Sequence, residues 1–139
     1  MSDAKNGLTK PLAKYSHCRR VGDLLLIAGQ GCRDPKTNIW AGVEFGSKNE
    51  ILSIDFAAQV KGVLRNIEDV LRSQGLTRSH LVDVQVFLTD MKEQFDQMNQ
   101  IWNEFFESVE NPPTRTTVAV KGLPGHNLIE MKSFASFKV

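Results

Sequence analysis

The chain has few of the residues that build metal centres. Its 139 residues include two cysteines, Cys18 and Cys32, and three histidines. Their spacing fits no zinc signature, and no two histidines stand one helical turn apart as in metalloproteases. We therefore expect no metal site and two reduced thiols. Cys32 follows a glycine in a predicted loop and could be exposed, and the simplest interpretation is a free thiol with no role.

Net charge and long apolar runs are also lacking. Seventeen Lys and Arg against sixteen Asp and Glu give a net charge of +1, whereas dedicated nucleic-acid binders usually carry a basic excess. No apolar run approaches the roughly 20 residues of a membrane helix, and the polar segment 1–10 has no signal-peptide core. These absences predict a cytoplasmic protein whose partners include neither a membrane nor a nucleic acid.

What is present is an ordinary globular composition, 41% hydrophobic and 24% charged. The length predicts a single domain over residues 1–139, with residues 1–12 as a flexible or loosely packed N-terminal segment.

Turn and periodicity signals predict the order β-β-β-α-β-α-β-β. A hairpin over 15–21 and 24–28 is followed by a short edge strand over 39–43. A helix capped by Ser53 carries an apolar stripe from Ile54 to Leu71 and stops at Gly75. A strand over 81–88 precedes a second helix that begins behind Asp90 and carries Phe95. The last two strands open at Arg115 and at about residue 128.

These elements predict an α+β domain of two layers, a mixed sheet with both helices on one face. The other face keeps apolar residues such as Val118 and Val120, or Phe134, depending on register. Copies of the chain can bury that face, so we expect a closed homo-oligomer.

The last third of the chain holds the most informative pair of residues. Arg115 opens one predicted strand and Glu130 lies in the next, with a Gly-Leu-Pro-Gly turn between them. If the two strands are neighbours, a guanidinium suited to binding a carboxylate lies beside a carboxylate that can hold a water. This combination suggests hydrolysis of a small carboxylate-bearing molecule. A structural salt bridge between Arg115 and Glu130 is the alternative.

Several short motifs together resemble the reactive intermediate/imine deaminase (RidA, or YjgF) family. They are Tyr15, Ala28-Gly29-Gln30, Phe87-Leu88-Thr89-Asp90-Met91 with Phe95, Asn99 and Phe105-Phe106, Pro113-x-Arg115-x-Thr117, Leu123-Pro124 and Ile129-Glu130-Met131. The resemblance covers the chain from about Tyr15, and the spacing from Arg115 through Leu-Pro to Glu130 is its most specific part.

The resemblance implies a chorismate-mutase-like domain in a homotrimer with a central β-barrel and a site between subunits. It implies that Arg115 binds the substrate carboxylate, that Glu130 and backbone groups such as the Thr117 carbonyl orient a water, and that no cofactor is needed. Substrate contacts are implied for Tyr15, Gly29, Gln30 and Phe95. Ala28 and Thr117 stand where many members have serine and cysteine, which suggests a different substrate.

A narrower resemblance is to the 2-aminomuconate deaminases, carried by residues 15–20, Arg33 and residues 115–120. Their substrate has two carboxylates, and Arg33 or His17 could bind the second. Gln30-Gly31 departs from the Thr-Ser-type loop of that branch. The resulting hypothesis is hydrolysis of 2-aminomuconate to 4-oxalocrotonate and ammonia. A general 2-imino acid deaminase, a non-catalytic trimer that binds keto acids and an RNA-cleaving protein are the alternatives.

Overall fold

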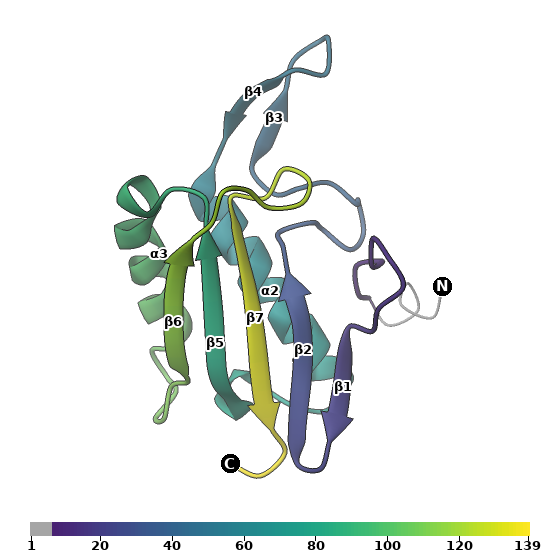
Figure 1. Ribbon diagram of the computed structural model, residues 1–139, viewed down its shortest axis with the longest axis vertical. Helices are drawn as coiled ribbons and strands as arrows, with labels where there is room; N and C mark the ends of the chain where they lie inside the picture. The colour runs from purple at the N-terminus through teal and green to yellow at the C-terminus, as the bar shows by residue number, and fades with distance from the viewer. Residues whose placement is uncertain (1–6) are drawn as a thin grey trace.

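The structure is a computed structural model that describes residues 7–139, and its main element is a five-stranded sheet. The strands are β1 (Cys18–Val21), β2 (Leu24–Gln30), β5 (Leu81–Leu88), β6 (Thr114–Ala119) and β7 (Ile129–Ser136). Their order across the sheet is β1-β2-β7-β5-β6 (Figure 1). All neighbours are antiparallel except β5 and β6, which are parallel. The predicted mixed sheet is therefore confirmed.

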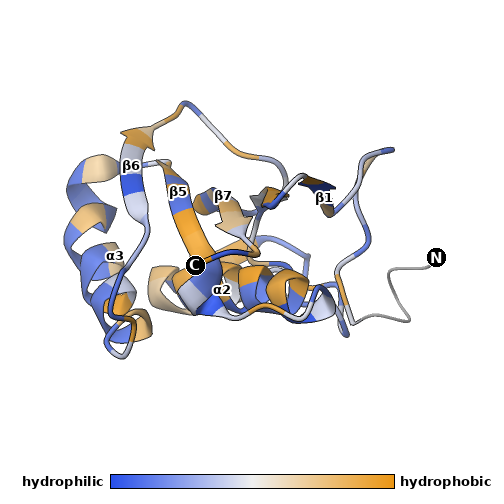
Figure 2. Cartoon of the chain, turned by 90° about the horizontal axis from the view of Figure 1, so that it is seen from below, coloured by the Kyte–Doolittle hydropathy of each residue, from blue (hydrophilic) through white to orange (hydrophobic). Residues whose placement is uncertain are grey.

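Two helices pack on one face of this sheet (Figure 2). Helix α2 (Phe56–Ser73) begins after Asp55, whose side chain accepts a hydrogen bond from the Ala58 amide. Helix α3 (Met91–Phe105) begins after Asp90, which caps the Glu93 amide in the same way. A short 3-10 turn, η1 (Arg78–His80), leads into β5. The two-layer α+β architecture is as predicted.

Alternation along the central strands places the core between the sheet and the helices. Along β7, Ile129, Met131, Ser133 and Ala135 are buried, and the residues between them are half-buried on the opposite, open face. The buried set packs with the apolar residues of α2, such as Val63 and Ile67. No helix in residues 7–139 combines enough length with enough apolar character to span a bilayer.

Two local predictions are wrong. The strand predicted over 39–43 begins at Val43, because residues before it form a loop in which Gly42 takes a φ of 71°. The short strand β3 (Val43–Phe45) pairs with β4 (Ile51–Ile54) in a hairpin outside the main sheet. Ser53 therefore lies in a strand, and the helix cap is Asp55.

Cys32 is buried, although its predicted loop position allowed exposure. Its carbonyl and side chain lie against the site of Gly62 in α2, where an added Cβ would come within 3.2 Å of the Cys32 Cβ. Burial raises the pKa of the Cys32 thiol to about 11, which keeps it protonated and unreactive at neutral pH. The prediction for residues 1–12 falls half on residues outside the described range; within that range Leu8 is buried.

Candidate functional site

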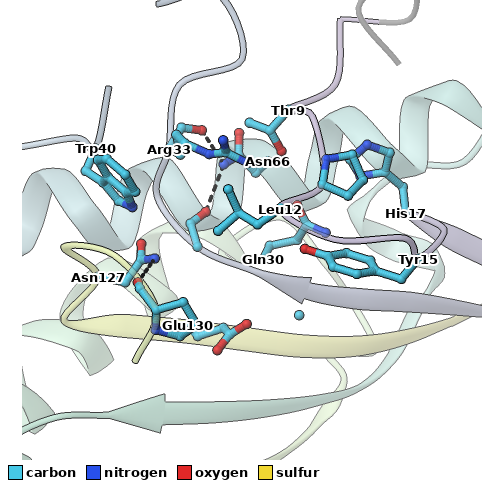
Figure 3. Close-up of a pocket in the computed structure, with 14 residues that line it drawn as sticks. Thr9, Leu12, Tyr15, His17, Gln30, Arg33, Trp40, Asn66, Asn127 and Glu130 are labelled. Atoms are coloured by element: carbon cyan, nitrogen blue, oxygen red, sulfur yellow. Dashed lines mark hydrogen bonds between the residues drawn. The ribbon is translucent and has the colours of Figure 1, made fainter. Parts of the chain in front are cut away.

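A small cavity of about 80 Å³ lies where the ends of β2 and β7 meet the segment before β1. Six of the residues singled out in the sequence line it, together with Leu12, Trp40, Asn66 and Asn127 (Figure 3). The six are Tyr15, His17, Gly29, Gln30, Arg33 and Glu130. His17 and Gln30 are buried and Tyr15 is exposed, so the cavity has both a closed end and an open one.

Glu130 brings the negative charge to this cavity. It is the second residue of β7 and is half-buried on the open face of the sheet. Its carboxylate occupies the space beside Gly29, where an added Cβ would lie 2.5 Å from Oε1. Burial raises the pKa of Glu130, and no salt bridge joins it to a cation within residues 7–139. An unneutralised carboxylate with raised basicity can orient a water or accept its proton.

Buried amides from helix α2 and the loop before β7 hold the cavity walls in place. Gln59 donates to the His126 carbonyl and accepts from the Leu128 amide. Asn66 donates to the carbonyls of Gly31 and Arg33. The sequence analysis missed both residues, although a polar residue within the apolar stripe of a helix is a signal for such a role.

Asn127 fixes the loop on the other side of the cavity. Its Oδ1 accepts from the Cys32 amide at 2.9 Å and its Nδ2 donates to the Pro124 carbonyl at 2.8 Å. The approach is close, because an added Cβ at Gly31 would lie 2.6 Å from Oδ1. The loop that leads into β7 is thereby joined to the loop that follows β2. This contact spans 95 residues of sequence, and no local pattern announces it.

The three remaining predicted residues lie at the other edge of the sheet. Arg115 and Thr117 are on the edge strand β6, and Phe95 is on α3 beside it. The Arg115 guanidinium carbon lies 5.0 Å from the ring centre of Trp102 and 5.9 Å from that of Phe95. Partial burial lowers the pKa of Arg115. The Thr117 hydroxyl is buried and has no hydrogen-bond partner among the described residues.

The prediction that the strands of Arg115 and Glu130 are neighbours is wrong. Strand β5 lies between β6 and β7, with Val84 opposite Arg115 and Phe87 opposite Glu130. Residues directly opposite each other share a face of the sheet, and positions three apart along a strand lie on opposite faces. Arg115 therefore faces the helices and Glu130 faces away from them. A structural salt bridge between them within one chain is excluded.

Comparison with known proteins identifies the family. The family model described as Endoribonuclease L-PSP matches residues 7–137. A RutC family protein of Pyrococcus abyssi is 35% identical over 126 residues, covering 91% of this chain and 88% of the relative. The chain belongs to the YjgF/RidA/RutC family.

Solved structures agree with this assignment. RidA from an Antarctic Psychrobacter is 26% identical, with a TM-score of 0.79 and 94% coverage of each chain. The YjgF gene product of E. coli has the same fold, with a TM-score of 0.79, 24% identity and 94% coverage of each chain. RidA proteins include imine deaminases, and some relatives are named endoribonucleases. Membership therefore establishes the fold, whereas the activities of the relatives differ from one another.

Proposed function

We propose that this RidA-family protein is a cofactor-independent deaminase that hydrolyses an imine or enamine of a small carboxylate, with 2-aminomuconate as its substrate. The observation that carries the proposal is the state of Glu130. It is a half-buried carboxylate with raised pKa, held beside Gly29 in a cavity and paired with no cation in residues 7–139. A carboxylate in a structural ion pair has a cationic partner, which Glu130 lacks among these residues. A raised pKa without such a partner is typical of a residue that accepts or donates a proton in catalysis.

The chemistry needs one water and no external electrons. 2-Aminomuconate tautomerises to an imine whose carbon adjoins a carboxylate. Water held by Glu130 attacks that carbon and gives up a proton, the nitrogen takes up protons, and the carbon–nitrogen bond breaks to leave a ketone and ammonia. Arg115 holds the adjoining carboxylate and stabilises negative charge, so positioning and electrostatics supply the acceleration.

We further propose that the site is completed between the subunits of a homotrimer. Glu130 and its cavity lie near the β1–β2 edge of the sheet, and Arg115 lies on β6 at the opposite edge. A head-to-tail contact between copies brings the first edge of one subunit to the second edge of the next, and a ring closes it. Exposed apolar residues such as Leu24 and Val118 give such a contact surface to bury.

Ammonia release tests the proposal. The substrate is 2-aminomuconate generated in situ, with 2-iminobutyrate as the simple imine. Wild type is expected to release ammonia, and Glu130→Gln, which keeps the size but loses the charge, is expected to turn over on the order of 10²-fold more slowly with nearly unchanged affinity. Ligand binding without ammonia release from either compound would favour a non-catalytic, keto-acid-binding trimer. A lower melting temperature with unchanged turnover in Glu130→Gln would contradict the water-positioning role of Glu130.

A further inference from the structure

We infer that Arg33 binds the distal carboxylate of the substrate and makes the cavity selective for dicarboxylates over monocarboxylates of the same length. The inference rests on the proposed function, since it concerns the same cavity. Its basis is the way the fold holds a guanidinium at this cavity without giving it a negative partner.

The backbone of Arg33 is fixed by pairing with Trp40 in an isolated antiparallel bridge. Residues directly opposite each other in such a bridge send their side chains to the same side. Both residues line the cavity, so its wall contains a cationic side chain and a flat apolar ring. That pair suits a carboxylate at the end of a planar, conjugated chain.

The Arg33 guanidinium is positioned by neutral acceptors. Nη1 donates to Asn38 Oδ1 at 2.8 Å, and Nη2 donates to the Lys10 carbonyl. Asn38 lies in the left-handed region, with a φ of 62°. An arginine has five N–H donors, so donors remain for a ligand while the side chain is already oriented.

The acidic residue next to Arg33 in sequence, Asp34, does not neutralise this charge. Asp34 Oδ1 accepts from the amides of Lys36 and Thr37, and Oδ2 lies 3.5 Å from Arg65. These amides lower the pKa of Asp34 and hold its carboxylate in its own turn. No salt bridge to Arg33 is present within residues 7–139. No described carboxylate pairs with Arg33, so its positive charge is available to an anion.

Arg33 also lies on the side of the cavity that the distal carboxylate reaches in the proposed binding mode. Arg33 and Asn66 form the side of the cavity away from the Glu130 carboxylate (Figure 3). A substrate that places its imine carbon near Glu130 extends its chain toward Arg33. A monocarboxylate whose carboxylate is bound by Arg115 has no second carboxylate for Arg33 to bind. A dicarboxylate gains a charge-assisted contact with Arg33.

Binding of two unreactive ligands tests the inference without relying on turnover. trans,trans-Muconate has a carboxylate at each end of a six-carbon diene, and sorbate has the same chain with a methyl in place of one carboxylate. By calorimetry on the full chain, wild type is expected to prefer muconate by about 10- to 150-fold, the range of one charge-assisted contact. Arg33→Gln is expected to abolish this preference and leave the affinity for sorbate unchanged.

Two further variants separate ligand binding from structural support. Arg33→Lys keeps the charge and is expected to bind muconate more tightly than Arg33→Gln does. Lys36→Gln makes the same charge change three residues away, outside the cavity lining, and is expected to keep the wild-type preference. An undiminished preference in Arg33→Gln, an equal loss for both ligands, or equal muconate affinities of the lysine and glutamine variants would overturn the inference. Absence of ammonia release with the predicted muconate preference would instead count against the deaminase proposal alone.

Discussion

Mixed assemblies of two impaired variants give the sharpest test of where the site lies. Arg115→Ala removes the proposed carboxylate-binding group, and Glu130→Gln removes the proposed water-positioning group. In a site shared between subunits, a ring that contains both variants has some interfaces at which an intact Arg115 meets an intact Glu130. In a site confined to one chain, every subunit of the mixture lacks one of the two groups.

The register of the sheet shows why a site within one chain is not expected to work. Arg115 and Glu130 are two strand spacings apart across the sheet and three residues apart along it. With about 4.8 Å between strands and about 3.3 Å per residue, their Cα atoms are separated by about 14 Å. Their side chains also leave opposite faces, so no small substrate contacts both.

The expected recovery follows from counting interfaces. With equal, random mixing, an interface has intact Glu130 on one side with probability one half and intact Arg115 on the other with probability one half. About one quarter of the sites in a cyclic ring are then intact. Arg115→Ala alone is expected to lose about 10- to 150-fold in kcat/KM, from a contact of about 1.5–3 kcal/mol. Recovery to about a quarter of wild-type activity is therefore clearly above either parent.

Ammonia release from the co-expressed, co-purified mixture provides the measurement, and light scattering reports the number of chains, expected to be three. Each variant alone and a mixture combined after purification, before subunits exchange, provide the controls. Activity of the co-expressed mixture equal to the mean of its parents would refute the shared site. A monomer at micromolar concentration would refute it as well.

Two further outcomes follow from Glu130. Gly29→Ala places a Cβ 2.5 Å from Glu130 Oε1, so the carboxylate has to move. Because a 1 Å misplacement in a catalytic site reduces the rate by about 10²-fold, we expect turnover to fall by about that factor. The thermal midpoint, measured by calorimetry, is expected to change less. Burial raises the pKa of Glu130, and the base acts unprotonated, so kcat/KM is expected to fall with decreasing pH at values above the ordinary glutamate range. A pH–rate profile in which Glu130→Gln retains this acid limb would contradict the role.

Local signals in the sequence predicted most of the helices and strands. The limits of β5 are those predicted, and Gly22-Asp23 marks the turn between β1 and β2. These features depend on residues close together in the chain. The hairpin of β3 and β4 was missed because it pairs only with itself and contains three and four residues, too few for a clear alternation.

The strand order depended on contacts that no local pattern encodes. The Gly-Leu-Pro-Gly turn suggested a hairpin between the strands of Arg115 and Glu130. The connection between Ala119 and Ile129 is nine residues long, which exceeds a tight hairpin loop and allows the chain to pass over the end of β5. Loop length was thus the available signal, and turn composition was misleading.

Among the residues of the cavity wall, some could be predicted from local motifs and others depend on long-range contacts. The resemblance to RidA proteins pointed to Tyr15 and Glu130, whose positions the motif fixes. Trp40 and Asn127 were missed, because their place in the wall depends on contacts with residues distant in sequence, Gly125 for the first and Cys32 for the second. Such contacts exist only once the fold has formed.

The separation of Arg115 from Glu130 has a chemical consequence. A guanidinium and a carboxylate on neighbouring strands with side chains on one face would pair with each other, and a substrate carboxylate would have to compete with that pair. In this chain β5 and the alternation of the sheet keep the two apart, and Arg115 lies against Trp102 and Phe95 instead of an acid. The shared site that we propose places the substrate between opposite charges that the fold of one chain keeps from neutralising each other.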